Sequence, residues 1–161
     1  MRRKDREVTD FNEMLELIDE EEVLRLALSD EAGTYIVPVN YGYQYGSGEE
    51  GNVLSFFIHG AAQGRKANIL TAAASSGSEI PFEIDGRHLP EISDSCDASY
   101  YYMSVIGTVR VTVLDSDEKL NALNALMDNV MPADEYHFQE SVVERTMLCR
   151  LDVTSWTCKK H

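Results

Sequence analysis

Hydrophobic and polar residues alternate along several short runs of this chain, a period that is typical of half-buried β-strands. In the run from 100 to 114, every valine has the same parity, and Gly107 marks a bend or bulge. Comparable runs, rich in β-branched, leucine and aromatic residues, cover 23–29, 34–45, 53–59, 79–85 and 146–156. The pattern predicts six strands.

Three other segments have a helical composition or repeat apolar residues at helical spacing. The first covers about 10–22 and begins with Asp10 and Glu13, a pair that resembles a capping box. The second is "AAQGRKANILTAAA" (61–74), and the third covers 117–130. Because the strands follow one another like hairpins, with the helices placed irregularly between them, we expect a mainly β fold with flanking helices. An antiparallel barrel fits this order better than a doubly wound α/β sheet.

Turn residues separate these elements. "DEAG" (30–33) joins the first two strands as a hairpin, whereas residues 46–52 and 86–99 are predicted to be loops. Pro38 lies within the second strand and has no N–H to donate to a neighbouring strand. It must therefore face an edge, a bulge or a bound ligand.

The composition is that of one soluble globular domain, 1–161, with tails over 1–8 and 157–161. Fourteen basic and twenty-eight acidic residues give a net charge of −14, which argues against nucleic acid or an anionic membrane as a partner. The apolar runs are too short to span a bilayer. Three cysteines without paired spacing and a charged N-terminus predict a reduced, cytoplasmic protein.

Arg65 and Lys66 form the one adjacent basic pair away from the chain ends, and Gly60 and Gly64 flank the loop before them. Glycines let backbone N–H groups approach an anion, a helix N-terminus adds partial positive charge, and two cations can pair with phosphate oxygens. The pattern fits a phosphate site and, equally well, a solvated basic turn. It is not a Walker loop, because the glycine spacing is one residue short and no Ser or Thr follows Lys66.

Other candidate groups give weaker signals. His59 ends a predicted strand beside this loop and can line the same pocket, although a strand-end histidine is more often structural. The histidines and cysteines lack metal-binding spacing, so we expect no metal site. Cys96 has acidic neighbours that would raise its pKa, so an inert thiol is expected. Four tyrosines lie on one face of an ideal strand, and they suit either a stacking surface or a core or dimer interface: Tyr35, Tyr41, Tyr43 and Tyr45.

Four stretches, taken in their order and spacing, resemble a known family: "YIVPVNYGY" (35–43), "FFIHGAAQGRKANIL" (56–70), "FEIDG" (82–86) and "YMSVIGTV" (102–109). They are similar to the pyridoxamine-phosphate-oxidase-like FMN-binding split barrels and, among these, to the nitroimidazole-resistance (Nim) proteins. The resemblance runs from the N-terminus to about Trp156. It implies a six-stranded antiparallel split β-barrel that forms a homodimer, with FMN held in clefts between the subunits.

The resemblance also implies which residues bind the cofactor. Arg65 and Lys66 match the positions that hold the FMN phosphate, and Gly64 leaves room for it. A second set matches the segments beside the isoalloxazine ring and ribityl chain: Pro38, Val39, Asn40, Tyr41, Phe57, Ile58, His59, Gly60 and Ala61. A third set matches the segment that approaches from the partner subunit: Ser104, Val105 and Ile106.

The chain departs from the family pattern at two places. "ASSGSEIPFEID" (74–85) replaces a lysine-rich segment and carries Pro81, so a shorter or more mobile strand is expected there. "YIVPVNY" (35–41) has no arginine, and the chain ends "TCKKH" (157–161), so vitamin B6 oxidation is disfavoured.

Two hypotheses about function follow from the resemblance. The first is a flavin-dependent reductase in which NADH, NADPH or another donor supplies electrons through FMN to a small acceptor such as a nitroaromatic, while His59 orients the acceptor or donates a proton. The second is a flavin- or haem-binding carrier or sensor on the same barrel, without turnover of its own.

Overall fold

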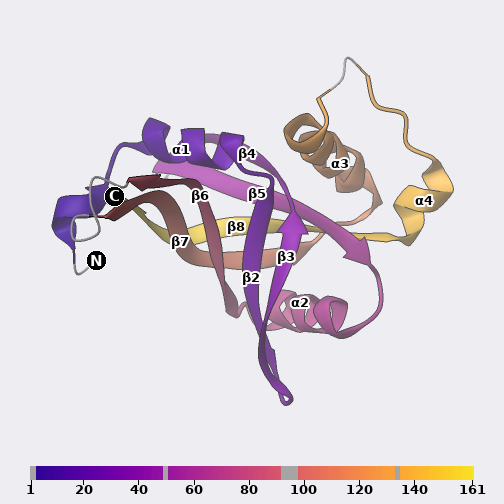
Figure 1. Cartoon of the computed structure of the whole chain (residues 1–161). Coiled ribbons are helices and arrows are strands. Elements are labelled where there is room, and N and C mark those ends of the chain that lie inside the picture. Colours follow the sequence, from indigo (N-terminus) through magenta and orange to yellow (C-terminus); the bar gives the residue numbers. More distant parts are fainter. Residues whose placement is uncertain (1–2, 49–50, 92–97, 133–134) are drawn as a thin grey trace.

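The computed structural model describes residues 3–48, 51–91, 98–132 and 135–161, and it shows one antiparallel sheet with flanking helices (Figure 1). The strands are β1 (Glu7–Val8), β2 (Val23–Asp30), β3 (Gly33–Asn40), β4 (Gly42–Gly48), β5 (Gly51–Ala61), β6 (Glu79–Glu91), β7 (Ser99–Val113) and β8 (Thr146–Lys160). The helices are the 3-10 turn η1 (Lys4–Arg6), α1 (Phe11–Glu20), α2 (Arg65–Ser76), α3 (Ser116–Val130) and α4 (Glu140–Arg145).

The strands pair in the order β3-β2-β6-β7-β8-β5-β4, with β1 added at the end of β8, and all neighbours are antiparallel. The two end strands, β3 and β4, are consecutive parts of one extended run that is interrupted at Tyr41. The backbone at Tyr41 therefore joins the two ends of the sheet, although no ladder pairs β3 with β4 in the described part of the chain. This is the open arrangement of a split barrel, and the expected fold class is confirmed.

The interruption at Tyr41 has a physical cause. The Tyr41 side chain is fully buried, its hydroxyl donates to the Ile18 carbonyl in α1 (2.6 Å), and its ring packs edge-on against Phe56 (5.3 Å between centroids). The expected strand over 34–45 is therefore two strands. With β1 added, the described sheet has eight strands, not six.

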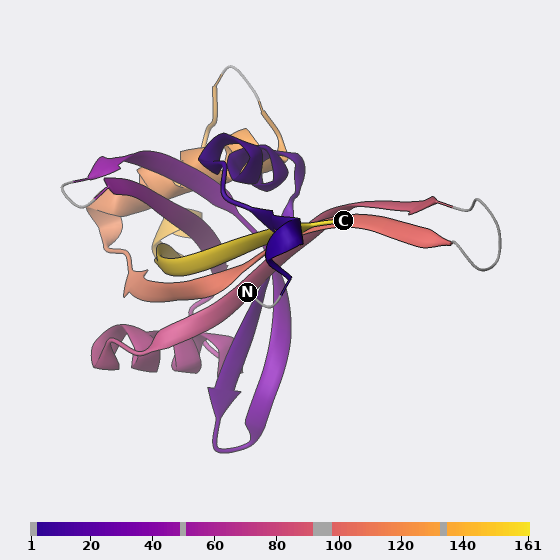
Figure 2. The ribbon, with the colours of Figure 1, turned by 90° about the vertical axis from the view of Figure 1, so that its left-hand side faces the viewer.

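Several elements extend beyond the expected boundaries. β6 continues to Glu91, so residues 86–91, expected to be loop, belong to this strand, which pairs with β7 with a shift of register between Gly86 and Leu89. The two strands form a ribbon that projects from the barrel (Figure 2). Pro81 does not shorten β6. β8 continues to Lys160, so most of the expected C-terminal tail belongs to the sheet, and Glu7 and Val8 of the expected N-terminal tail pair with it. Part of the expected loop 46–52 is also strand, because β4 reaches Gly48 and β5 begins at Gly51.

The barrel interior is filled by alternate side chains of the strands, as in β2, where Leu24, Leu26 and Leu28 are fully buried. Helix α1 adds one apolar face to this core, and Asp10 caps it by accepting hydrogen bonds from the N–H groups of Asn12 (2.8 Å) and Glu13 (3.3 Å). A smaller cluster lies between α3 and the sheet: Phe57, Leu114, Ala122, Ala125, Leu126 and Leu148. In the described part of the chain, the helices are too short or too polar to cross a membrane.

Gly42 is the point at which α3 crosses the sheet, because a Cβ at this position would overlap the Ala125 carbonyl. We expect Gly42→Ala to lower the free energy of unfolding by about 2–3 kcal/mol, since backbone atoms of α3 would have to move. Urea unfolding followed by circular dichroism measures this.

The matched control is Gly46→Ala on the same strand, where an added Cβ meets nothing within 4 Å. Its free energy of unfolding should change by less than about 0.5 kcal/mol. Equal losses in the two variants would contradict the close approach of α3 to Gly42.

Candidate functional site

Helix α2 begins shortly after β5, and its N-terminal end lies beside the β2–β3 hairpin (Figure 1). Gly64 is the N-cap, with a φ of 104° that glycine adopts without strain, and it makes no side-chain cap. The N–H groups of the first turn therefore remain available to an outside acceptor and carry the partial positive charge of the helix end. A Cβ at Gly64 would meet nothing within 4 Å, so the space beside it is open.

Arg65 points from α2 toward the hairpin and is held there by four contacts. Its Nε and Nη2 donate to the two carboxylate oxygens of Asp30 (2.8 and 2.6 Å), and Nη2 also donates to the Gly33 carbonyl (2.7 Å). Its guanidinium lies over the Tyr35 ring, 4.1 Å from the centroid. This pairing lowers the pKa of Asp30. Arg65 therefore already pairs with one anion, the Asp30 carboxylate. Its Nη1 makes no hydrogen bond to the described residues.

Lys66 points in a different direction, toward the end of β5. Its Nζ donates to the His59 carbonyl (3.3 Å), a neutral acceptor that does not cancel the ammonium charge. Gly60 makes this possible, because a Cβ there would come 2.7 Å from Lys66 Nζ. The partial burial of the His59 ring and, second, the Lys66 charge lower the pKa of His59. The lowered pKa favours the neutral imidazole at pH 7.

The residues expected along the flavin differ in how they can meet a ligand. Pro38 and Asn40 are exposed on β3, an end strand of the sheet, which confirms an edge position for Pro38. His59, Gly60 and Ala61 reach the surface at the end of β5. The side chains of the others are buried, so only their backbone could face a cofactor: Val39, Tyr41, Phe57 and Ile58.

The segment Ser104, Val105 and Ile106 does not join the other site residues within one chain. The ladder places Pro38, Arg25, Glu83 and Ile106 in one row across β3, β2, β6 and β7, so the two ends of the row are about 14 Å apart. Val105 is buried in the core, whereas Ile106 is 54% exposed on the outer face.

A groove of about 740 Å³ lies between α2, the β2–β3 hairpin and the start of β6. Asp30, Gly64 and Arg65 line one end of it, and Ile69, Ile80 and Pro81 contribute apolar surface. This volume is in the range of small-molecule sites.

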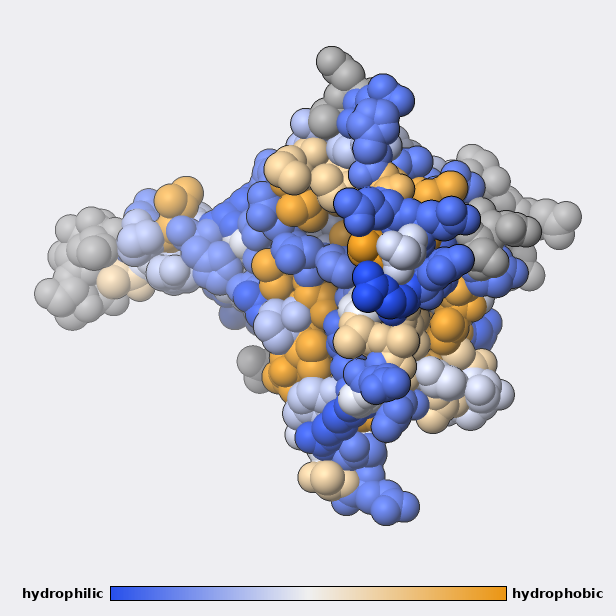
Figure 3. All heavy atoms as spheres, turned by 90° about the vertical axis from the view of Figure 1, so that its right-hand side faces the viewer, coloured by the Kyte–Doolittle hydropathy of each residue, from blue (hydrophilic) through white to orange (hydrophobic). Residues whose placement is uncertain are grey.

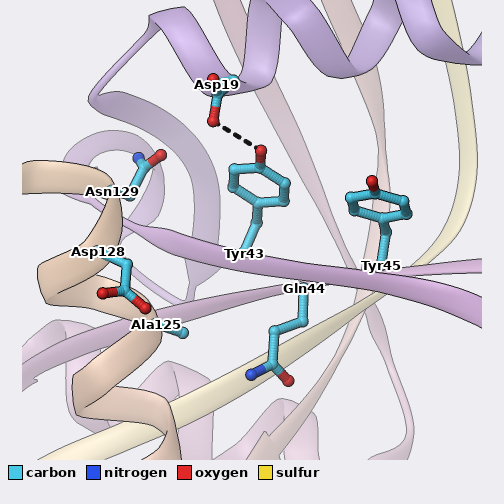
Figure 4. A pocket seen from close by; sticks show the side chains of 7 residues that line it. All are labelled: Asp19, Tyr43, Gln44, Tyr45, Ala125, Asp128 and Asn129. Carbon is cyan, nitrogen blue, oxygen red and sulfur yellow. Dashed lines mark hydrogen bonds between the residues drawn. The ribbon is translucent and has the colours of Figure 1, made fainter. Parts of the chain in front are cut away.

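A second hollow, of about 450 Å³, lies between α1, β4 and α3 (Figure 4). Tyr43 points upward from β4 and donates to Asp19 Oδ1 (2.8 Å), with Asp128 and Asn129 on the α3 side. No cationic side chain lines this hollow in the described structure, so it does not fit a phosphate. The four tyrosines therefore do not form one surface: Tyr35 packs on Arg65, Tyr41 is in the core, and only the other two line this hollow.

The remaining candidates are the cysteines and the possible metal ligands. The described residues hold no group of three metal-binding side chains. Cys149 and Cys158 are buried, and burial raises the pKa of each thiol to about 11. Cys96 lies outside the described residues.

Together, the donor groups at the start of α2 fit a phosphate: an uncapped helix N-terminus, the uncompensated Lys66 and the free Nη1 of Arg65. The contacts of the Arg65 guanidinium with Asp30, Gly33 and Tyr35 could not be predicted from the sequence. These three residues belong to a hairpin about thirty positions earlier, and nothing in the local pattern links them to α2.

Comparisons with known proteins agree with this fold. Comparison with curated protein sequences finds no match. Similar solved structures include a candidate 5-nitroimidazole antibiotic resistance protein from Bacteroides thetaiotaomicron, with 19% identity, 96% of this chain and 86% of that chain covered, and a TM-score of 0.78. An FAD and haem binding protein from Mycobacterium smegmatis has 19% identity, 96% and 72% coverage, and a TM-score of 0.76. The flavocytochrome Anf3 from Azotobacter vinelandii has 15% identity, 100% and 72% coverage, and a TM-score of 0.78.

At these identities the structural likeness shows the fold alone. A family model adds to it: the one described as pyridoxamine 5'-phosphate oxidase matches residues 10–160, nearly the whole chain. The chain therefore belongs to the pyridoxamine 5'-phosphate oxidase family.

Proposed function

We propose that this protein is a cytoplasmic, FMN-dependent reductase of the nitroimidazole-resistance type, which passes electrons from NADH or NADPH to a small acceptor such as a nitroaromatic. The observation that carries the proposal is the start of α2, where an uncapped helix N-terminus with open space beside Gly64 is followed directly by two cations, Arg65 and Lys66. A phosphate monoester is the ligand that such groups bind well. Flavin binding is supported by family membership and by flavin-binding neighbours of the same fold.

Each site residue has a role that its geometry allows. Lys66 would bind the phosphate as a point charge, and Arg65 would contribute through its guanidinium. The exposed edge of β3 at Pro38 and Asn40 would lie along the ring system. A bound flavin would supply the electron transfer itself. His59, whose lowered pKa favours the neutral form at pH 7, would orient an acceptor through its ring N–H, and solvent can deliver the protons that reduction consumes.

We include a homodimer in the proposal because the outer face of β3, β2, β6 and β7 carries exposed apolar side chains. Ile36 is 67% exposed and Ile106 is 54% exposed. Ile106 shares a ladder row with Pro38, and Ile36 lies two residues from Pro38 on β3, so both point to the same side of the sheet. Arg25 lies between them and pairs with Glu83 and Asp85. A second copy on this face would bring the segment 104–106 of one subunit toward the α2 site of the other. Light scattering should give twice 18.1 kDa, and a monomer would contradict this part.

A non-catalytic flavin- or haem-binding protein is the second candidate. It is favoured by the similarity in fold to an FAD and haem binding protein and to a flavocytochrome. Fold alone does not decide between the two functions.

The visible spectrum of the purified protein tests the function directly. We expect flavin absorption that is bleached by NADH or NADPH and restored by a nitroimidazole, because the cofactor would then cycle between donor and acceptor. A flavin that no donor reduces would leave the binding protein as the function. A Soret band in place of flavin absorption would mean haem.

The phosphate assignment predicts that Arg65→Ala combined with Lys66→Ala weakens FMN binding by about 2 kcal/mol, roughly 30-fold. Riboflavin, which has no phosphate, should bind both proteins alike. Fluorescence titration measures each dissociation constant.

The charge-matched control is Lys4→Ala with Arg145→Ala, which removes two cations from η1 and α4, at opposite sides of the molecule in Figure 1. If both double variants lose FMN affinity equally, long-range charge explains the effect, and a contact at α2 does not.

The surroundings of His59 predict the pKa of its imidazole. Its pKa should lie below 6.5 in the wild type, and Lys66→Gln should raise it, because one of the two causes of the shift is then removed. NMR titration of the imidazole Cε1 proton, assigned with His59→Gln, measures both values. An unchanged pKa in the Lys66 variant would show that burial acts alone.

A further inference from the structure

Asp30 lies at the turn of the β2–β3 hairpin, and its carboxylate makes two kinds of contact. Its Oδ1 accepts a hydrogen bond from the Ala32 N–H (2.9 Å), which shapes the turn. Its two carboxylate oxygens also accept the paired donors of Arg65, so the carboxylate lies where the guanidinium presents its fork to an anion. Both side chains remain partly exposed, Arg65 at 40% and Asp30 at 32%.

The hairpin has few other attachments near its tip. β2 pairs with β6 only at Arg25 and Leu26, so the strands beyond that point leave the rest of the sheet. Residues 29–34 are all exposed, and the tip forms the lowest projection of the surface in Figure 3, where hydrophilic residues predominate. The contacts of Arg65 with Asp30, Gly33 and Tyr35 are therefore a main link between the tip and α2.

We propose that Asp30 is a built-in counter-ion that competes with a ligand phosphate for Arg65, so that the chain binds a phosphorylated flavin at the expense of the contact between the hairpin and α2. This inference rests on the proposed flavin function and extends it to a residue that sets the affinity for the phosphate. The Nε–Nη2 edge of Arg65, which Asp30 occupies, pairs with one oxyanion at a time, and Nη1 alone offers a phosphate no such paired contact. A phosphate at the N-terminal end of α2 would lie beside the end of the groove that Asp30, Gly64 and Arg65 line, and the two anions would repel each other.

Competition for Arg65 would make the protein distinguish flavins that carry a phosphate from flavins that do not. A flavin without phosphate gains nothing from Arg65 and is unaffected by Asp30. A phosphorylated flavin gains the paired contact with Arg65 only when it displaces the carboxylate, and the hairpin is then less firmly held. Asp30 therefore lowers the affinity for FMN and FAD while it stabilises the ligand-free form.

The test is the variant Asp30→Asn, which keeps an oxygen for the Ala32 N–H and removes the charge. Its dissociation constant for FMN should fall about three- to tenfold, and that for riboflavin should not change. The control is Glu31→Gln, which removes the same charge from the neighbouring, exposed turn position. An Asp30→Asn affinity that is unchanged, weaker or equal to that of Glu31→Gln overturns the inference.

Amide hydrogen exchange is a second test of the competition for Arg65. On addition of FMN to the wild-type protein, amides of residues 28–36 should exchange faster, whereas riboflavin should leave them unchanged. Slower exchange would mean that Arg65 binds Asp30 and the phosphate at the same time, which would contradict competition between the two for Arg65. A wild-type protein that binds no flavin at all overturns the proposed function and this inference with it. FMN binding that is insensitive to Asp30→Asn overturns the inference alone.

Discussion

One extended run of the chain changes partners at Tyr41, and the site depends on this change. Before Tyr41 the run pairs with β2, and after it with β5. The buried hydroxyl has a partner in the Ile18 carbonyl, and leaving such a group unpaired would cost about 1–3 kcal/mol. Burial also raises the pKa of Tyr41 far above its usual value, so it remains a neutral donor. In the described sheet β3 pairs with β2 alone, so its other edge carries no ladder, and Pro38 lies in this end strand.

Local patterns in the sequence predicted the elements whose cause is local. The cap at Asp10, the hairpin turn at 30–33 and the alternation of β7 each depend on residues within a few positions, and the structure contains all three. The split barrel itself came from the resemblance of four motifs. The alternation of apolar and polar residues predicts strands, but it does not determine how they pair.

What the sequence could not predict depends on distant partners. The break at Tyr41 arises because α1 and Phe56 bury one ring, and the extension of β6 through Glu91 arises because β7 pairs with it. In the site, Arg65 and Lys66 are adjacent in sequence but point to different elements, Arg65 to the hairpin and Lys66 to β5. A basic pair indicates charge, while the direction of each side chain follows from the tertiary fold.

The two cations also have different electrostatic consequences. Arg65 is largely balanced by Asp30, so in this acidic chain the uncompensated charge at the start of α2 belongs to Lys66. The same charge lowers the pKa of His59, whose carbonyl accepts from Lys66. A phosphate bound at Lys66 would offset that charge and raise the pKa of His59 toward its usual value. If Lys66 binds a phosphate as proposed, the proton affinity of the imidazole would be coupled to phosphate binding, even though the ring and the phosphate need not touch. In the proposed function, a bound phosphate would thus raise the protonated share of the imidazole, and His59 would still donate a hydrogen bond to an acceptor through a ring N–H.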